Sequence, residues 1–475
     1  MTRWRLLTLA YLAAGPNLMA AEVTVQPGDS IQSHVDRNPP GTSFLIKSGL
    51  YRLQSIEPKR GDTFRGEKGA VLSGAVVVKP FRKQGPLWTA DLRVQQMRSV
   101  GECAANAPAC NLPEDLFVDN VLVPRALNIE GAAQGRWYLD YAGSKLYLGV
   151  NPEGHDVEMS LTRNAFSGDV GNVTIQGLTI EKYASPTGAG AVHCATLERG
   201  GRRGINWVVE NNEIRWNHDV GVWIGNGMRV AHNHLLHNGH MGVGGSAKDV
   251  VVDDNEIAYN NYAGYDYHWG AGGAKFVLSE NLQVRNNYVH HNEGPGLWSD
   301  IDNDHVLYEK NRTSFNKVAG IFFEISFGAV IRDNIIENDG DNPGGPTGFR
   351  SGAGIVLNTS SDAEIYGNQI ANCPNGILAI QVNRGVSDWT KRTYALKNLY
   401  VHDNTITQKS GIAAGIDAGP AYVPDVFTAW NNRFKNNTYR FPDLGGRHFE
   451  WMNGSRGIEE WKGFHNDAEG RFLKL

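Results

Sequence analysis

The chain has 475 residues, a net charge of −5 at neutral pH, 56 glycines and 4 cysteines. So few cysteines in so long a chain exclude a fold built on disulfides, and the acidic balance supplies no basic field, so we expect no nucleic-acid partner. The many glycines and the few helical runs favour short strands and tight turns in one elongated repeat domain.

Residues 1–21 have the layout of a cleaved signal peptide. Arg3 and Arg5 precede an apolar run that ends in small residues near Ala20. A Gly-Pro-Asn segment interrupts this run before it reaches the roughly 18 apolar residues that a membrane span needs, and no later stretch comes close. We therefore expect a secreted or periplasmic protein without a membrane span.

Residues 22–87 are expected to form an N-terminal cap, with SIQSHVDRN at its start, and the first coils of the repeat domain. Residues 88–165 have a strand-turn-strand pattern that departs from the later repeat, which predicts a small β insertion. Cys103 and Cys110 bracket a short loop in this insertion and could form a disulfide in an oxidising compartment. We expect Cys194 and Cys373 to be unpaired.

Residues 166–440 repeat one phrase: an apolar strand, an asparagine, an apolar residue, a second polar turn, then glycine and another apolar strand. VVENNEIRWNHDVGVWI and LYEKNRTSFNKVAGIFF are two copies. The basic period is about 22 residues, and longer steps carry insertions, as in a solenoid with loops on its coils. The asparagines of the phrase are Asn212, Asn233, Asn255, Asn287, Asn311, Asn334, Asn368 and Asn404.

This repeat predicts an all-β fold, a parallel β-helix. Strands of successive coils then lie about 4.8 Å apart, so the equivalent asparagines can hydrogen-bond along the stack. We interpret this asparagine ladder as scaffold. Residues 441–475, with GIEEWKGFHNDAEGRF, are expected to cap the open end of the solenoid.

Five strands that begin with glycine can be aligned, at Gly221, Gly273, Gly296, Gly320 and Gly354. Because side chains alternate between the two faces of a strand, the alignment sorts the following residues. The predicted inward residues are Val222, Ile224, Ala274, Phe276, Leu297, Ile301, Ile321, Phe323, Ile325, Ile355 and Leu357. The predicted outward residues are Trp223, Lys275, Trp298, Asp300, Asp302, Phe322, Glu324, Ser326 and Asn358.

Two carboxylates fall at one position of this outer strip. Asp300 and Glu324 share a strand position on successive coils, which predicts a backbone separation of roughly 5 Å. Two carboxylates this close do not ionise independently, so one can act as an acid while the other stays charged, as glycosidic cleavage requires. Lys275, one coil below, and Asp302 complete the catalytic candidates. The alternative is that these charges only form structural ion pairs.

Aromatic side chains lie on the same strip and suit the flat faces of sugar rings. The insertions at residues 261–272 and 339–353 are expected to project beside the strip as walls of a cleft. The predicted substrate-binding residues are Trp298, Phe322, Trp223, Tyr267, His268, Trp269, Arg350 and Asn358.

Metal-binding signals are weaker. The segment HNHLLHNGH contains His232, His234, His237 and His240, but two of them fall in the scaffold turn and no acidic partner has zinc-site spacing, so we predict no zinc site. Asp300 and Asp302 are hard oxygen ligands, and calcium is the one cofactor kept open. GAGGAKF lacks the ending of a phosphate-binding loop.

The repeat phrases, together with EDLFVDN, WYLDYAGSKLYLG, HWGAGGAKF and GPGLWSDIDND, resemble the pectin-lyase-like superfamily, and more narrowly its secreted bacterial right-handed parallel β-helix repeat proteins. The resemblance covers most of the chain after residue 21. It implies a right-handed helix and an activity among lyases, glycoside hydrolases, esterases and epimerases that act on polysaccharide. The segment that usually reads Trp-Glu in this subgroup is Trp269-Gly270 here.

Three functions remain open. We favour a glycoside hydrolase in which Asp300 and Glu324 divide the acid and the base or nucleophile roles. A polysaccharide lyase would use Lys275, His268 or Arg350 to remove the C5 proton of a uronic acid. A glycan-binding surface protein would keep the aromatic strip without catalysis. The expected partner in every case is a polysaccharide or oligosaccharide, and the sequence selects no oligomeric state.

Overall fold

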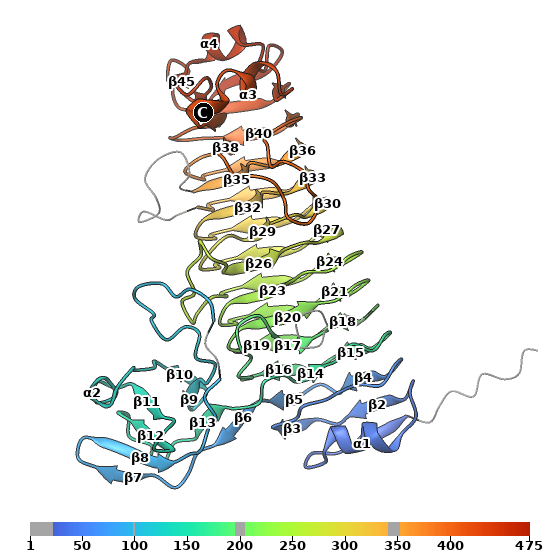
Figure 1. The fold of residues 1–475 in the computed structure, drawn as a ribbon, viewed down its shortest axis with the longest axis vertical. Coiled ribbons are helices and arrows are strands. Elements are labelled where there is room, and N and C mark those ends of the chain that lie inside the picture. Colours follow the sequence, from blue (N-terminus) through green and yellow to red (C-terminus); the bar gives the residue numbers. More distant parts are fainter. Residues whose placement is uncertain (1–21, 98–99, 195–204, 341–351) are drawn as a thin grey trace, which may run out of the picture.

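A computed structural model describes residues 22–97, 100–194, 205–340 and 352–475. The predicted signal peptide and Arg350 lie outside these residues. The described chain forms a parallel β-helix whose coils stack along the long axis, from the N-terminal residues at the base in Figure 1 to the C-terminal residues at the top. This architecture confirms the predicted fold class.

Three long parallel sheets form the walls of the helix. Sheet 1 has 13 strands, from β1 (Val23–Val25) to β42 (Arg433–Lys435), and sheet 2 has 13 strands, from β3 (Gly49–Arg52) to β46 (Arg471–Lys474). Sheet 3 has 12 strands, and the five aligned glycines lie in its strands or directly before them. They are β14 (Phe166–Ser167), β17 (Gly190–His193), β20 (Val220–Ile224), β23 (Met241–Gly245), β26 (Gly272–Phe276), β29 (Leu297–Asp300), β32 (Ala319–Glu324), β35 (Ala353–Asn358), β38 (Ile377–Gln381), β41 (Ala414–Ala418), β44 (Phe449–Glu450) and β45 (Ser455–Arg456).

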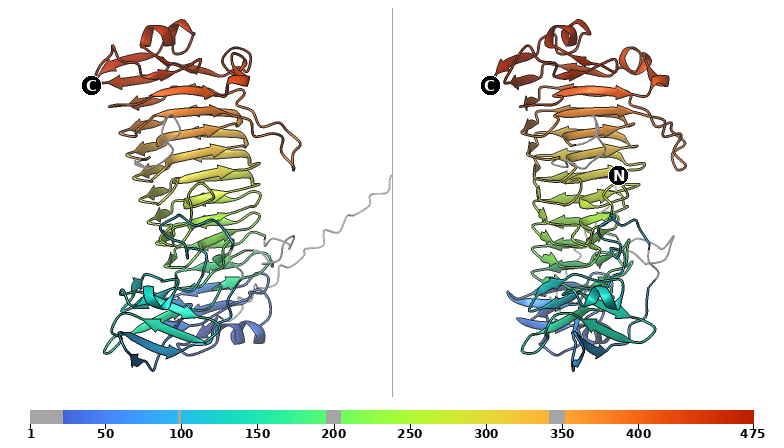
Figure 2. Two further views of the ribbon diagram at one scale, coloured as in Figure 1. Left: turned by 60° about the vertical axis from the view of Figure 1, so that its left-hand side comes forward. Right: turned by 90° about the vertical axis from the view of Figure 1, so that its left-hand side faces the viewer.

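Two small antiparallel sheets branch off near the base of the helix, as Figures 1 and 2 show. Their strands are β6 (Ala75–Val77), β7 (Arg82–Gln84), β8 (Leu87–Asp91), β9 (Leu116–Val118), β10 (Val121–Val123), β11 (Trp137–Asp140), β12 (Lys145–Leu148) and β13 (Val157–Ser160), and helix α2 (Ile129–Ala132) lies beside them. They bury a core of their own around Trp137 and Leu146. The predicted β insertion is therefore present.

Short helices lie at both ends of the stack. Helix α1 (Ile31–Arg37) begins after Ser30, whose hydroxyl accepts a hydrogen bond from the Ser33 amide at 3.2 Å. It buries Ile31 and Val35 against the first coil. At the other end lie a 3₁₀ turn (Pro420–Tyr422), α3 (Asp425–Thr428) and α4 (Ile458–Gly463). Together they shield the apolar ends of the coil stack from water.

All eight predicted asparagines form one continuous ladder between sheets 1 and 2. At Asn311, for example, the side-chain oxygen accepts from Asn287 Nδ2 at 3.0 Å, and the side-chain amide donates to Asn334 Oδ1 at 3.1 Å. The ladder ends on Asn437 and Asp467. A second ladder between sheets 2 and 3 was not predicted and consists of Asn217, Asn238, Asn260, Asn292, Asn316 and Asp339.

Most of the predicted inward residues belong to one apolar core that fills the whole helix. Ile301 is the clear exception, with 39% of its surface exposed. Strand β29 ends at Asp300, and Ile301 and Asp302 then take φ values of +60° and +56°, so the alternation of faces stops there.

Two further assignments after the strand ends were wrong for the same reason. Ile325, with φ of +34°, is buried outside the helix core, in a cluster with Phe327 and Tyr394. Ser326 is not outward but fully buried, and its hydroxyl accepts a hydrogen bond from the Asn303 amide at 3.2 Å. The corner between sheets 3 and 1 is thus a polar turn rather than a continuation of the strand.

Candidate active site

Asp300 and Glu324 are direct register partners on the adjacent parallel strands β29 and β32. The register is fixed by the neighbouring pairs Leu297 with Ile321 and Trp298 with Phe322, so the two carboxylates extend from the same face of sheet 3. Both are largely buried, with exposed fractions of 7% and 8%. Burial raises the pKa of Glu324, and the negative charge of Asp300 raises it further.

Glu324 is held by two donors that bind the same oxygen. Arg384 Nη1 lies 2.6 Å from Oε1, and Asn358 Nδ2 donates to Oε1 at 2.9 Å. Oε2 takes part in neither bond. The Arg384 guanidinium and the Lys275 ammonium oppose the rise in the Glu324 pKa but do not cancel it. A proton on Oε2 is therefore compatible with both contacts.

Lys275 is the counterion of Asp300. Its ammonium lies 2.8 Å from Asp300 Oδ2, donates to the Trp269 carbonyl at 2.8 Å, and sits 3.8 Å from the centre of the Trp298 ring. An ammonium makes the ion pair and the ring contact through its positive charge. The arrangement places the Asp300 carboxyl group against a cation and beside Glu324, whose pKa is raised.

The aromatic strip is stacked rather than open. The rings of Trp298 and Phe322 lie 5.3 Å apart at an interplanar angle of 14°. Trp298 points outward as predicted, yet it is only 2% exposed, because Lys275 and Phe322 cover it. It is therefore part of the floor of the site and not the exposed platform that the alternation predicted.

A loop that sequence reasoning did not assign to the site covers the pair. It connects β38 to β39 (Tyr400–His402) of sheet 1 and carries Arg384 to Glu324. Ser387 of the same loop donates to Asp302 Oδ2 at 2.8 Å, and Arg392 lies 2.7 Å from Asp304 Oδ2. We call residues 382–396 the strap. Figure 2 shows it, in orange, standing off the side of the coils.

The sequence held a signal for the strap. The step from Asn368 to Asn404 in the ladder is 36 residues, well above the basic period, which indicates an insertion between these two coils. The pattern does not say where such an insertion folds, and Arg384 is 60 residues from Glu324 in the chain.

The predicted wall at residues 261–272 does reach the site. Trp269 accepts the hydrogen bond from Lys275, and its ring stacks on His240 at 5.5 Å. His240 in turn contacts Asp219 Oδ1 through Nδ1 at 2.7 Å. The other predicted wall, 339–353, lies mainly outside the described residues, and so does Arg350.

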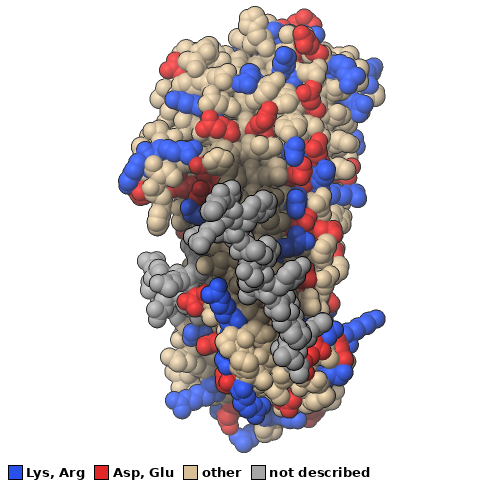
Figure 3. Space-filling model, turned by 90° about the vertical axis from the view of Figure 1, so that its right-hand side faces the viewer, with Lys and Arg blue, Asp and Glu red and all other residues tan. Residues whose placement is uncertain are grey.

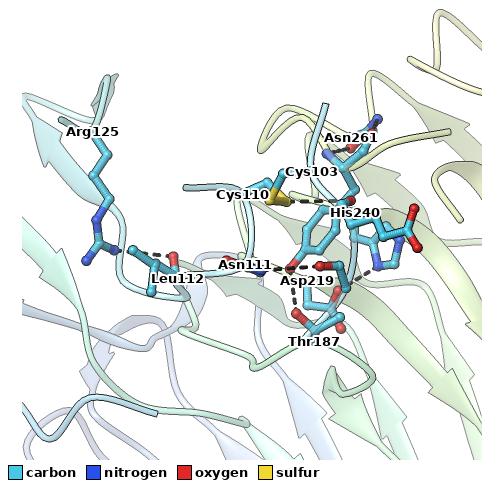
Figure 4. The surroundings of a disulfide bond; sticks show 12 residues. Cys103, Cys110, Asn111, Leu112, Arg125, Thr187, Asp219, His240 and Asn261 are labelled. Carbon is cyan, nitrogen blue, oxygen red and sulfur yellow. Dashed lines mark hydrogen bonds and ion pairs between the residues drawn. A yellow bond between two sulfur atoms is a disulfide. The ribbon is translucent and has the colours of Figure 1, made fainter. Parts of the chain in front are cut away.

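The loop closed by a disulfide is hydrogen-bonded to this wall. Cys103 and Cys110 are bonded, as the sequence suggested, while Cys194 and Cys373 are free and buried. Figure 4 shows the disulfide beside Asn261, His240 and Asp219. The backbone of the disulfide loop bonds to the wall, from the Ala104 amide to the Gly264 carbonyl at 3.0 Å and from the Asp266 amide to the Glu102 carbonyl at 2.9 Å.

The remaining predicted substrate contacts lie away from the pair. Trp223 is on β20, two strands before Lys275 in sheet 3, and stacks on His193 at 5.8 Å. His268 is exposed and pairs with Asp266 at 2.9 Å. Tyr267 is half-buried beside the disulfide, in a cluster with Cys110 and Tyr265. The structure therefore brings together Lys275, Trp298, Asp300, Phe322, Glu324, Asn358 and Trp269.

The structure offers no support for metal ligands at these positions. Among the residues it describes, no three histidine, cysteine or acidic side chains are placed to hold an ion. Asp300 and Asp302 are engaged by Lys275 and Ser387, and His232 and His234 each pair with a carboxylate of the next coil.

Other surface features are separate from the pair. A cavity of about 420 Å³ lies between the β insertion and the helix, with Arg125, His218 and Tyr262 among its lining residues. On the face in Figure 3, acidic and basic side chains are interspersed rather than gathered by sign. No helix in the described part of the chain is long and apolar enough to cross a membrane.

Comparison with known proteins establishes the fold. Residues 200–370 match the family model described as right handed beta helix region. The structure of XylC in complex with xylose is similar, with a TM-score of 0.68, 14% identity, and coverage of 95% of this chain and 86% of that one. The helix is thus right-handed. Comparison with curated protein sequences finds no match.

Weaker structural matches include two further carbohydrate-active proteins. The A-module of a mannuronan C-5 epimerase from Azotobacter vinelandii gives a TM-score of 0.47 at 12% identity, covering 94% of this chain and 91% of that one. The catalytic unit of an α-1,3-glucanase from Streptomyces thermodiastaticus gives 0.46 at 13% identity, covering 98% and 69%.

Proposed function

We propose that the protein is an exported glycoside hydrolase in which Asp300 and Glu324 are the catalytic pair. The observation that carries the proposal is their register: two buried carboxylates occupy one position on adjacent strands, and their environments differ. Asp300 is paired with the Lys275 ammonium, whereas burial and the neighbouring Asp300 charge raise the pKa of Glu324. Two carboxyl groups in environments that differ in this way can divide the acid and base roles.

In this mechanism Glu324 protonates the oxygen of the leaving sugar, and Asp300 acts on the opposite side of the scissile bond. Partners on adjacent parallel strands have backbones about 4.8 Å apart. Side chains at paired positions start close together, and a close carboxyl pair is the arrangement of retaining enzymes, at roughly 5–5.5 Å, rather than of inverting enzymes, at about 6.5–9.5 Å. We therefore favour Asp300 as a nucleophile that forms a glycosyl-enzyme intermediate, which water hydrolyses with Glu324 as the base, and products that keep the anomeric configuration.

Entry of a sugar requires Arg384 to move. Glu324 is 8% exposed and lies beneath Arg384, whose side chain is 35% exposed. The guanidinium is held by one ion pair, which the hydroxyl groups and the glycosidic oxygen of a bound sugar would replace. The Trp298 and Phe322 rings form the apolar floor below.

The similarity to a structure that contains xylose supports a sugar ligand but does not select one. The disulfide supports export, because such bonds persist in oxidising compartments.

A polysaccharide lyase is the second candidate, and Arg384 is the observation in its favour. A second cation beside the pair could neutralise the carboxylate of a uronic acid. The base that this reaction needs is harder to supply, because the Lys275 ammonium is already held by Asp300, the Trp269 carbonyl and the Trp298 ring. The hydrolase therefore fits the contacts better.

Isosteric variants test the assignment. Glu324→Gln keeps the shape and the bonds to Oε1 but removes the titrating proton, so we expect hydrolysis to fall at least a hundredfold with folding unchanged. Asp300→Asn should do the same, and Asp417→Asn, at the same register position of sheet 3 three strands beyond Glu324, serves as the matched control. Full activity in Glu324→Gln, with circular dichroism and melting temperature like those of the parent protein, would reject the pair.

A further inference from the structure

The tip of the strap exposes a tryptophan beside the candidate active site. Trp389 is 72% exposed, the largest fraction among the large apolar side chains of the described residues. Its neighbours Asp388, Thr390 and Lys391 are exposed and polar. An exposed indole ring keeps apolar surface in contact with water, which is unfavourable. Burial of the ring against a ligand would remove this cost.

The tip of the strap is bonded to Asp302 through the Ser387 hydroxyl. Ser387 Oγ accepts hydrogen bonds from the amides of Trp389 at 3.1 Å and Thr390 at 2.8 Å, and it donates to Asp302 Oδ2 at 2.8 Å. Trp389 is two residues from Ser387, so its Cα lies at most about 7 Å from that of Ser387. The backbone of Trp389 is thus held near the coil that contains Asp300.

The base of the strap is equally well anchored. Val386 and Thr393 form an antiparallel bridge, and the Arg392 guanidinium lies 3.5 Å from the centre of the Phe327 ring. Tyr394 stacks on Phe327 at 5.6 Å. These contacts make the strap a short, braced hairpin rather than a loose loop, so Trp389 keeps its place relative to the catalytic pair.

We propose that Trp389 is the stacking platform of an additional sugar subsite, which binds a ring of the same glycan chain on one side of the scissile bond. The inference rests on the proposed function and deepens it: the substrate is an oligosaccharide or polysaccharide, not a single glycoside. A flat indole face with polar neighbours matches a sugar ring, which presents C–H groups on its face and hydroxyls at its edge. A protein partner would need a larger apolar patch than Trp389 and the neighbouring Val386 supply.

The first test compares substrates of different length. Trp389→Ala should lower kcat/KM on oligosaccharides about tenfold, mainly through KM, because it removes one stacking contact. It should leave the hydrolysis of an aryl glycoside of one sugar unit unchanged. Trp389→Phe should keep most of the activity, and Val121→Ala, an exposed residue of the β insertion, is the control. Equal loss on long and short substrates, or no loss on either, would overturn the inference.

The second test needs no turnover. Binding of oligosaccharides of xylose, glucose and mannuronate is measured by calorimetry with the Glu324→Gln protein, with and without Trp389→Ala. A weakening of about tenfold without Trp389 supports the subsite even if no glycan is hydrolysed, in which case only the proposed function fails. Equal affinity with and without Trp389→Ala overturns the subsite alone. A change of oligomeric state on Trp389→Ala also overturns it, because the ring would then be part of a protein contact. An absence of any binding overturns both proposals.

Discussion

Removal of Arg384 should move the pH profile of the enzyme in a defined direction. Glu324 must be protonated to act as the acid, so activity falls as the pH rises through the pKa of Glu324. The Arg384 guanidinium holds that pKa down, and Arg384→Ala releases it upward. An opposite charge this close lowers a carboxyl pKa, and the partial exposure of the Arg384 side chain screens the effect without removing it.

The assay is kcat/KM as a function of pH. In Arg384→Ala the alkaline limb should lie at higher pH than in the parent protein, and in Arg384→Lys it should stay close to its original place. Arg312→Ala is the control, because Arg312 lies on sheet 2, outside the strap, and pairs with Glu337. If Arg384→Ala leaves the alkaline limb in place, or lowers it, Glu324 is not the acid whose proton controls the rate.

Two predictions concern stability. Asn311→Ala should lower the free energy of unfolding by about 3 kcal/mol or more in urea denaturation, because it leaves buried donors and acceptors on both neighbouring coils without a hydrogen-bond partner. The control is Gln283→Ala, on the outer face of β27 (Glu280–Arg285), which should change the free energy of unfolding by less than about 0.5 kcal/mol. Loss near that of the control would show that the ladder is not structural. Cys103→Ser should lower the melting temperature of the oxidised protein, remove its response to reductant and lower the free energy of unfolding by about 2 kcal/mol. An unchanged melting temperature would mean that the disulfide does not stabilise the protein.

The repeat makes most of the fold predictable. The asparagine phrase sets the coil length, and the glycine-led strands set the register, so the pairing of Asp300 with Glu324 follows from the amino-acid pattern alone. The second ladder also has a signal in the pattern, since each of its members follows a first-ladder asparagine by five residues, as Asn217 follows Asn212. An alignment that uses only one asparagine per coil does not detect this second ladder.

The failures have a common physical origin at the ends of the strands. Alternation of faces holds only while the backbone stays extended, and left-handed residues such as Ile301 end it without any sign in the hydrophobic pattern. The pairing of Glu324 with Arg384 depends on how a long insertion folds back, which a local period does not encode. The covering of Trp298 depends on the side-chain conformations of Lys275 and Phe322 on the neighbouring coils. The predicted outward direction of Trp298 was therefore correct, but its predicted exposure was wrong.

The most direct test of the central claim is the chemistry of the product. The purified protein without residues 1–21 is incubated with acidic and neutral glycans, while ultraviolet absorbance and new reducing ends are followed in parallel, with Glu324→Gln as the control. We expect new reducing ends without ultraviolet absorbance, and we expect these reducing ends to be lost in Glu324→Gln. The absorbance of an unsaturated uronate, or reducing ends that persist in Glu324→Gln, would contradict the central claim.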